Sequence, residues 1–191
     1  MSDQKENTGY LEGQLLLAMP AMGDPRFERA VIFICAHSED GAMGLVINRP
    51  TDQISFPDLL TQLAIEVKQP RTDVLVHAGG PVETTRGFVL HTADYVQDSS
   101  LVVSDSIVLT ATVDILKAIA QNKGPRHSLL ALGYAGWGPG QLDAEIQANG
   151  WLSLKADEDL VFEAPPAAKW DMAMGRLGVD VSLLSSDVGH A

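Results

Sequence analysis

The chain has 191 residues, of which 46% are hydrophobic and 20% are charged, which suits one ordinary domain with a full core. Its 25 acidic and 13 basic side chains give a net charge of −12, and the Lys and Arg residues are scattered along the sequence. Because proteins bind nucleic acids mainly through cations that neutralise phosphates, this charge argues against direct DNA binding and against binding to acidic membranes.

A single cysteine excludes an intrachain disulfide and favours a reducing compartment. The polar start, MSDQKENTG, lacks the apolar stretch of a signal peptide, and the longest apolar runs are too short to span a bilayer. We therefore expect a cytoplasmic protein without a membrane anchor. We also expect one domain over residues 9–184, with flexible termini at residues 1–8 and 185–191.

Apolar runs rich in Leu, Val and Ile predict three strands near the start of the chain, at residues 14–18, 30–37 and 43–48. The runs are nearly continuous rather than alternating, so both faces of their sheet should be covered. Between the second and third runs, Asp40 and Gly41 suit a tight hairpin turn. An apolar stripe at helical spacing then predicts a helix over residues 55–67, with Pro57 in its first turn.

The middle of the chain predicts two strands, residues 74–78 and 87–91, paired around the turn Gly79-Gly80-Pro81. The elements expected next are short strands at 101–103 and 107–109, a helix over 111–121 and a strand at 128–133. A glycine-rich turn, a short helix with Leu142 and Ile146, strands at 151–154 and 160–162, and a helix from Pro165-Pro166 to Gly178 complete the chain. Strands dominate and helices enter singly, which favours an α+β domain over a doubly wound one.

Cys35 and His37 lie two residues apart on one predicted strand, so their side chains should share a face. His37 could then activate the thiol as a nucleophile or redox group. The competing interpretation is a small buried hydrophobe next to a histidine at a strand end. The five histidines lack metal-ligand spacing, and although His77 and His91 could meet in space, we expect no metal and no cofactor.

Two glycine-rich segments could bind an anion. LGYAGWGPGQLDAEI reads as strand, turn and helix start, but Gln141 and Leu142 stand where a Walker loop needs lysine and a hydroxyl residue. The alternative is that the glycines only permit a tight turn over a packed Tyr134 or Trp137. In GGPVETTRGFVLH, Arg86 could hold an anion or could pair with a neighbouring carboxylate. No GxSxG motif of a serine hydrolase occurs.

Three stretches are notable together: GQLLLAMPAMGDPRFERAVIFICAHSEDGAMGLVINRP, HAGGPVETTRGFVLH and LGYAGWGPGQLDAEIQANGWL. They are long, collinear and ordered like the signature blocks of the YqgE/AlgH family of bacterial proteins, which the chain resembles over about residues 9–177. The resemblance implies a strand-rich α+β domain whose bifurcated sheet folds into a pseudo-barrel with helices packed around it. One branch of the family carries the name of a transcriptional regulator of alginate synthesis. The resemblance implies no catalytic residues.

Three functions remain open. The favoured one is a non-enzymatic binding or regulatory module, whose polar residues converge on a small anionic ligand or a protein partner. The second is an enzyme or redox sensor that uses Cys35 with His37, and the third is a DNA-binding regulator, which the net charge disfavours. The candidate ligand-binding residues are Arg29, His37, Asn48, Arg49, Gly79, Gly80, Arg86, Trp137 and Gln141.

Overall fold

The computed structural model of the chain describes residues 9–69, 71 and 73–180. Its strands are β1 (Gln14–Ala18), β2 (Val31–Ser38), β3 (Gly41–Val46), β4 (Val76–Ala78), β5 (Val82–Thr92), β6 (Leu101–Val102), β7 (Ile107–Thr110), β8 (Ser128–Trp137) and β9 (Trp151–Lys155). Its α-helices are α1 (Phe56–Gln62), α2 (Val113–Ala120), α3 (Gln141–Gln147) and α4 (Lys169–Arg176). Short 3₁₀ turns at Pro20–Met22, Pro25–Phe27 and Pro166–Ala168 and a π-helical turn at Asp159–Glu163 connect them.

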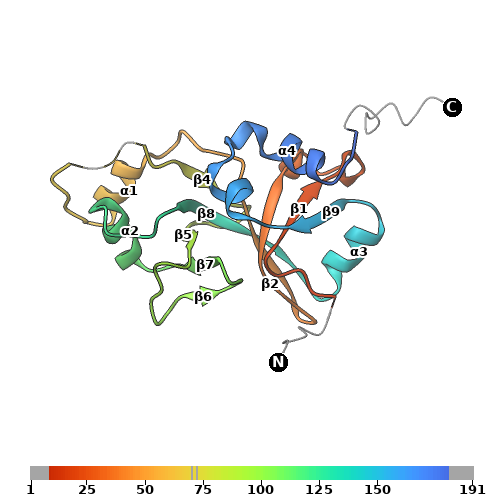
Figure 1. Cartoon of the computed structure of the whole chain (residues 1–191), viewed down its shortest axis with the longest axis horizontal. Helices are drawn as coiled ribbons and strands as arrows, with labels where there is room; N and C mark the ends of the chain where they lie inside the picture. The colour runs from red at the N-terminus through yellow and green to blue at the C-terminus, as the bar shows by residue number, and fades with distance from the viewer. Residues whose placement is uncertain (1–8, 70, 72, 181–191) are drawn as a thin grey trace.

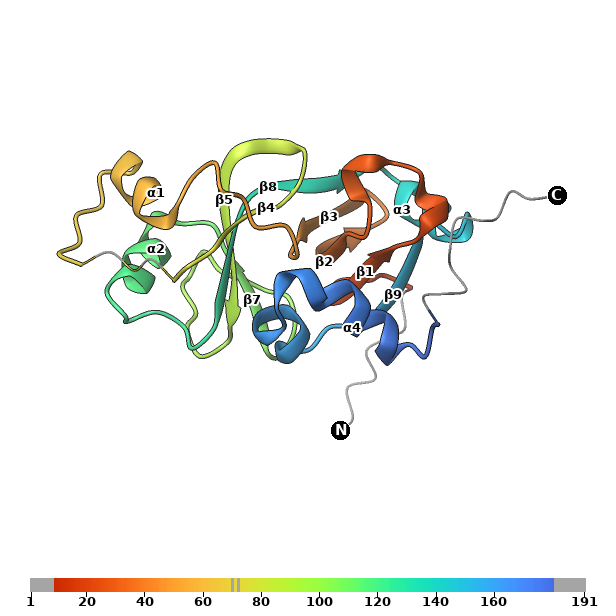
Figure 2. The ribbon, with the colours of Figure 1, turned by 90° about the horizontal axis from the view of Figure 1, so that it is seen from above.

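The strands form one sheet in the order β6-β7-β5-β8-β3-β2-β1-β9, with β4 also beside β8. The sheet divides at β8. Along one edge β8 pairs with β5, while along the other it pairs with β4 in parallel over its first half and with β3 in antiparallel over its second half. The two halves diverge from this strand, and the sheet curls into a half-barrel (Figures 1 and 2). This confirms the strand-rich α+β fold with a bifurcated sheet.

Helices and buried side chains cover both faces of the sheet. On one face, Leu15 of β1 and Phe33 of β2 pack with Trp170 of α4. On the opposite face, the neighbouring Leu16 and Ile32 pack in a second cluster that includes α3. A third cluster joins α1 and α2 to β4, β5 and β8 at the other end of the molecule (Figure 1). The continuous apolar runs of β1 and β2 are therefore buried on both sides, as predicted.

Most of the predicted elements are confirmed, including the hairpin between β2 and β3, where Gly41 has a φ of 134°. Helix α1 begins with a capping box, in which the Ser55 and Asp58 side chains each accept a hydrogen bond from the other residue's backbone N–H. The helix ends at Gln62, before the predicted end, because Ala64 has a left-handed φ of 55°.

The strand pair predicted around Gly79-Gly80-Pro81 is wrong, because β4 and β5 lie on opposite edges of β8. The connection between them must cross the backbone of β8, and the two glycines allow this close approach. A Cβ on Gly79 would lie 2.3 Å from the carbonyl oxygen of Gly133, and one on Gly80 would lie 2.1 Å from the carbonyl carbon of Tyr134. The glycines therefore serve a crossing and not a hairpin turn.

Two further predictions are wrong near the C-terminal end. The segment GYAGW is part of β8 rather than a turn, because its last three residues pair with β3, and the turn is confined to residues 138–140. Residues 160–162 form the π-helical turn rather than a strand. The Asp157 carboxylate accepts from the Leu160 N–H at 2.9 Å, and the Ala164 N–H donates to the Asp159 carbonyl at 2.8 Å, which closes the turn.

No helix in the part of the chain that the structure describes is long and apolar enough to cross a membrane. The termini for which we predict flexibility, residues 1–8 and 185–191, lie outside the described residues.

Candidate functional site

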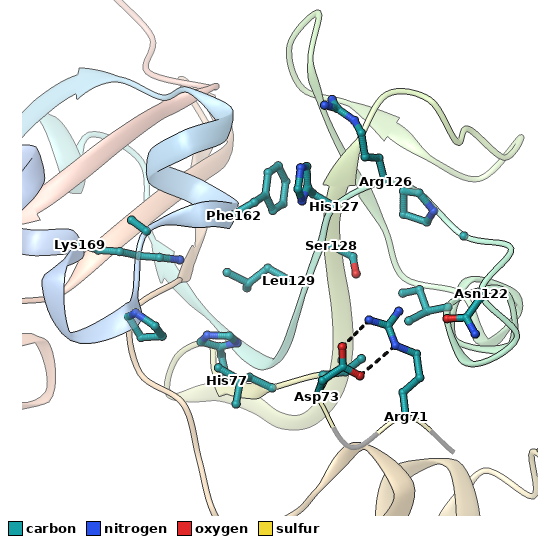
Figure 3. A pocket seen from close by; sticks show the side chains of 17 residues that line it. Arg71, Asp73, His77, Asn122, Arg126, His127, Ser128, Leu129, Phe162 and Lys169 are labelled. Carbon is teal, nitrogen blue, oxygen red and sulfur yellow. Dashed lines mark hydrogen bonds and ion pairs between the residues drawn. The ribbon is translucent and has the colours of Figure 1, made fainter. Parts of the chain in front are cut away.

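A cavity of about 360 Å³ opens between the two halves of the molecule, beside the start of β8 (Figure 3). The walls are β4, the loop that leads from α2 into β8, the π-helical turn and the first residue of α4. Its polar lining side chains come from segments far apart in the sequence: Arg71, Asp73, His77, Asn122, Arg126, His127, Ser128 and Lys169.

Lys169 is the first residue of α4 and lies on the buried face of this helix, one turn before Ala173. The residue is only 2% exposed. Its Nζ donates hydrogen bonds to the carbonyl oxygens of Ile47, at 3.0 Å, and Val161, at 2.7 Å. An ammonium group has three N–H donors, so one donor remains for a group in the cavity.

The two partners of Lys169 are neutral carbonyls, and no carboxylate pairs with this lysine among the described residues. Burial without a compensating charge disfavours the ammonium form. It lowers the pKa of Lys169 to about 8. A buried cation of this kind gains stability when an anion enters beside it.

His77 of β4 presents an unpaired acceptor to the same cavity, and the residue is only 4% exposed. Its Nδ1 lies 3.1 Å from the carbonyl oxygen of Leu130, and since a carbonyl only accepts, Nδ1 carries the proton. Nε2 then keeps its lone pair, and this buried atom has no hydrogen-bond partner. Burial, with a smaller contribution from the nearby Lys169 charge, lowers the pKa of His77 to about 4, so the ring is neutral at pH 7.

The rim of the cavity carries further cations, each already paired. The Arg71 guanidinium donates to Asp73 at 3.0 and 2.7 Å (Figure 3), and Arg126 donates to Glu158 at 2.8 Å. The lining contains three cationic side chains and the single carboxylate of Asp73, whereas the whole chain has a net charge of −12. Asp73 and Glu158 each compensate one of these arginines, so Lys169 is the lining cation that has no carboxylate partner among the described residues.

Two of the predicted site residues, Asn48 and Arg49, form hydrogen bonds that support the backbone behind this cavity. The Asn48 side chain accepts from the Val31 N–H at 3.0 Å and donates to the Arg29 carbonyl at 2.9 Å. The Arg49 guanidinium donates to the carbonyls of Arg26 and Glu28, while the Arg49 carbonyl accepts from the backbone of β4 at 2.8 Å. These bonds fix the chain directly after Ile47, whose carbonyl accepts from Lys169.

Gly79 has a similar role, because its carbonyl accepts from the last residue of β3 and its N–H donates to β8. Gly80 packs against the backbone of β8. The Arg29 guanidinium lies 4.8 Å from the centre of the Trp170 ring and 4.0 Å from the Asp171 carboxylate, on the outside of α4. None of these three predicted residues lines the cavity.

The remaining predicted residues lie around two shallow grooves on another part of the surface, which share Met43, Leu101 and Trp137. His37 lines one groove, and Arg86 lines the other. Arg86 lies 3.4 Å from the Glu83 carboxylate. The Trp137 indole donates to Glu145 at 2.6 Å, and the Gln141 side chain accepts from the backbone after β8 at 3.0 Å. The structure therefore does not bring the predicted residues into one pocket.

Cys35 is 3% exposed, and burial raises the pKa of its thiol. The Sγ atom contacts the carbonyl of Phe33 at 3.9 Å. The His37 Nδ1 accepts from the backbone of Leu11 at 3.0 Å, and its Nε2 lies 3.7 Å from Asp143. This arrangement does not favour the thiolate that a nucleophile or redox sensor needs.

Sequence reasoning did not consider Lys169 and treated His77 only as a metal ligand. A signal for Lys169 existed, because a lysine four residues before Ala173 falls on the apolar face of the predicted helix. No comparable signal marked His77, since its unpaired Nε2 depends on the parallel pairing of β4 with β8. No group of three or more His, Cys, Asp and Glu side chains suited to hold a metal occurs within residues 9–69, 71 and 73–180.

Known proteins are similar to this chain in sequence and in fold over nearly its whole length. A UPF0301 protein of Rhodospirillum rubrum is 56% identical over 187 residues, which cover 98% of this chain and 97% of that protein. The AlgH protein of Pseudomonas aeruginosa, known from its solution structure, is 42% identical with a TM-score of 0.80 over 98% of this chain and 100% of its own. A crystal structure of a Corynebacterium diphtheriae protein, 24% identical over 92% of each chain, matches with a TM-score of 0.74 and shows the fold alone.

The sequence profile of the AlgH-like family matches residues 15–182. The three stretches quoted above, residues 13–50, 77–91 and 132–152, lie within this range except for the first two residues of the first one. With this match and the relatives above, the resemblance is confirmed, and the chain belongs to the AlgH-like family.

Proposed function

We propose that the protein binds a small organic anion in the cavity between Lys169 and His77. The observation that carries this proposal is the buried ammonium of Lys169, which lines the cavity, keeps one free donor and has only carbonyl partners. An anion beside this group would offset the free energy of burying its charge. Asp73 and Glu158 already pair with the two rim arginines, so Lys169 is the lining cation without a carboxylate partner among the described residues, and this also favours an anionic ligand.

His77 adds a second requirement, because its Nε2 is a buried acceptor without a partner. An unsatisfied buried acceptor costs about 1–3 kcal/mol, so a ligand that donates a hydrogen bond there gains affinity. A hydroxy acid meets both demands, with a carboxylate for Lys169 and a hydroxyl for His77. The cavity of about 360 Å³ is near the lower end of ligand-pocket volumes, which suits a metabolite-sized molecule.

The other functions have weaker support. A redox or nucleophilic role of Cys35 conflicts with the burial of its thiol and the raised pKa of this group. Direct DNA binding conflicts with the net charge of −12, and the rim arginines Arg71 and Arg126 are paired with carboxylates. A protein partner would fit the grooves around Trp137, but no polar group there is left as unsatisfied as His77 Nε2 among the described residues.

Isothermal titration calorimetry of the full chain with 2-hydroxyglutarate tests the proposal. We expect saturable binding at one site. The Lys169→Met variant removes a charge-assisted hydrogen bond of about 1.5–3 kcal/mol, so it should bind at least about 10-fold more weakly. His77→Phe, which removes the acceptor, should also weaken binding.

The matched control is Arg86→Ala, because Arg86 lies beside a different groove and should leave the affinity unchanged. Thermal unfolding of each variant shows whether it is folded. If Lys169→Met is unfolded, Lys169→Gln is the second variant, because it removes the charge and keeps a polar side chain with an N–H donor. Absence of binding to the wild-type chain, or equal loss of affinity in Arg86→Ala and Lys169→Met, would refute the proposed site.

A further inference from the structure

We propose that Lys169 forms a Schiff base with the carbonyl carbon of a 2-oxo acid that enters the cavity. This inference rests on the proposed function, because the same cavity must first admit the organic anion. It extends that function from reversible binding to a covalent step, and it assigns the reacting atom as the Nζ of Lys169.

The hydrogen bonds of Lys169 orient the amine for this reaction. Nζ is tetrahedral, and two of its positions are directed at the carbonyl oxygens of Ile47 and Val161. When the ammonium loses its third proton, both hydrogen bonds persist, and the lone pair takes the position of the lost N–H. Because Lys169 lines the cavity, this lone pair is available to a bound carbonyl group (Figure 3).

Burial also makes the amine of Lys169 more reactive than the amines of the other lysines in the described part of the chain. Lys68, Lys117, Lys123 and Lys155 are exposed, and Lys169 is the buried lysine within the described residues. The pKa of Lys169, lowered by burial to about 8, leaves roughly a tenth of this amine neutral at pH 7. For an exposed lysine the neutral fraction is on the order of 300-fold smaller. A lysine that is desolvated in this way is a recognised type of activated nucleophile.

The step balances without a further reactant. The lone pair of neutral Nζ forms the C–N bond, the carbonyl π electrons move to oxygen, and a proton shifts from nitrogen to that oxygen. This gives a carbinolamine with a hydroxyl group, for which the unpaired His77 Nε2 is an acceptor in the same cavity. The hydroxyl then takes up a proton from solvent and leaves as water while the nitrogen lone pair forms the C=N bond. The protonated imine can return that proton to solvent, so the net reaction consumes the amine and the carbonyl and releases one water.

The cavity favours an oxo acid over an uncharged aldehyde or ketone. A guanidinium has five N–H donors, and in this structure Arg71 uses two of them on Asp73 and Arg126 uses one side-chain donor on Glu158. Both arginines line the cavity, and each keeps N–H donors beyond those used on its carboxylate partner. A carboxylate on the ligand gives these cationic groups a charge-assisted partner in the cavity that Lys169 lines, which an uncharged aldehyde or ketone does not.

Reductive trapping tests the inference. The full chain is incubated at pH 7.5 with pyruvate or 2-oxoglutarate and sodium cyanoborohydride, which reduces an imine to a stable amine. Intact-mass measurement and peptide mapping then locate the adduct. We expect one adduct per chain, on Lys169, formed at least about 10-fold faster than any adduct on the exposed Lys117.

Lys169→Arg keeps the charge and N–H donors but removes the nucleophile, so it should lose the adduct, whereas the matched Lys117→Arg should keep it. Failure of both oxo acids to label Lys169, or labelling of Lys117 at an equal rate, overturns the Schiff base. If 2-hydroxyglutarate still binds in calorimetry under that outcome, the proposed function stands without the covalent step. If the hydroxy acid does not bind either, both proposals are refuted.

Discussion

The buried charge of Lys169 should make the stability of the protein depend on alkaline pH. The pKa of this lysine is lowered in the folded state to about 8, from 10.5 in an exposed lysine. Between these two values the unfolded chain binds more protons than the folded chain, so the free energy of unfolding increases as the pH rises. The perturbation that isolates this effect is Lys169→Met, which removes the titrating group and retains a side chain of similar length.

The two pKa values set the magnitude. Between pH 7 and pH 9.5, the free energy of unfolding of the wild type should rise by about 2 kcal/mol relative to Lys169→Met. The variant also leaves the carbonyls of Ile47 and Val161 without their partner, but this cost does not depend on pH and cancels from the slope. Titration of exposed lysines and tyrosines is common to both proteins and cancels too.

Urea unfolding at several pH values, followed by tryptophan fluorescence, measures this difference. The wild type and Lys169→Met must be compared at the same ionic strength and without organic anions in the buffer, because a bound anion would stabilise the ammonium form. A difference between the two proteins that stays constant from pH 7 to pH 9.5 would refute the buried, uncompensated charge on which the site depends.

Three further predictions concern other residues. The pKa of His77 is lowered to about 4 in the folded state, against 6.5 in the unfolded chain. As the pH falls from 6.5 to 4, the free energy of unfolding of the wild type should therefore decrease by about 3 kcal/mol relative to that of His77→Phe. Urea unfolding in this acid range would measure the difference. Gly80→Ala should destabilise the fold by about 3 kcal/mol or more because its Cβ would overlap Tyr134, whereas Gly87→Ala, with 3.9 Å to its nearest neighbour, should change the thermal midpoint little. Cys35 should resist iodoacetamide in the folded protein and react in urea, and rapid native-state alkylation would contradict its burial.

The local elements could be predicted from the sequence, because apolar spacing and turn residues determine them. The first three strands, the hairpin at Gly41 and the capped start of α1 are examples. The crossing at Gly79 and Gly80 could not be predicted in this way, since a glycine pair suits a turn as well as a close backbone approach. Only the pairing of β4 and β5 on opposite edges of β8 separates the two cases.

The candidate site was harder to predict for a related reason. Asn48 and Arg49 were predicted as ligand-binding residues because they are polar and lie at a strand end. Their side chains instead form hydrogen bonds to the backbone near Arg29 and support the wall of the cavity. Lys169 and His77, which line it, are 92 residues apart in sequence and meet only through the curl of the sheet and the packing of α4. Family resemblance indicated the fold and left the chemistry of this cavity open.

The pKa of Lys169, measured by NMR at its side-chain Cε and Nζ with and without 2-hydroxyglutarate, tests the central claim most directly. The account predicts a pKa of about 8 for the free protein and a clear rise when the anion is bound, because the carboxylate stabilises the ammonium. A Lys169 that titrates near the value of an exposed lysine, or whose pKa is the same with and without the anion, would contradict it.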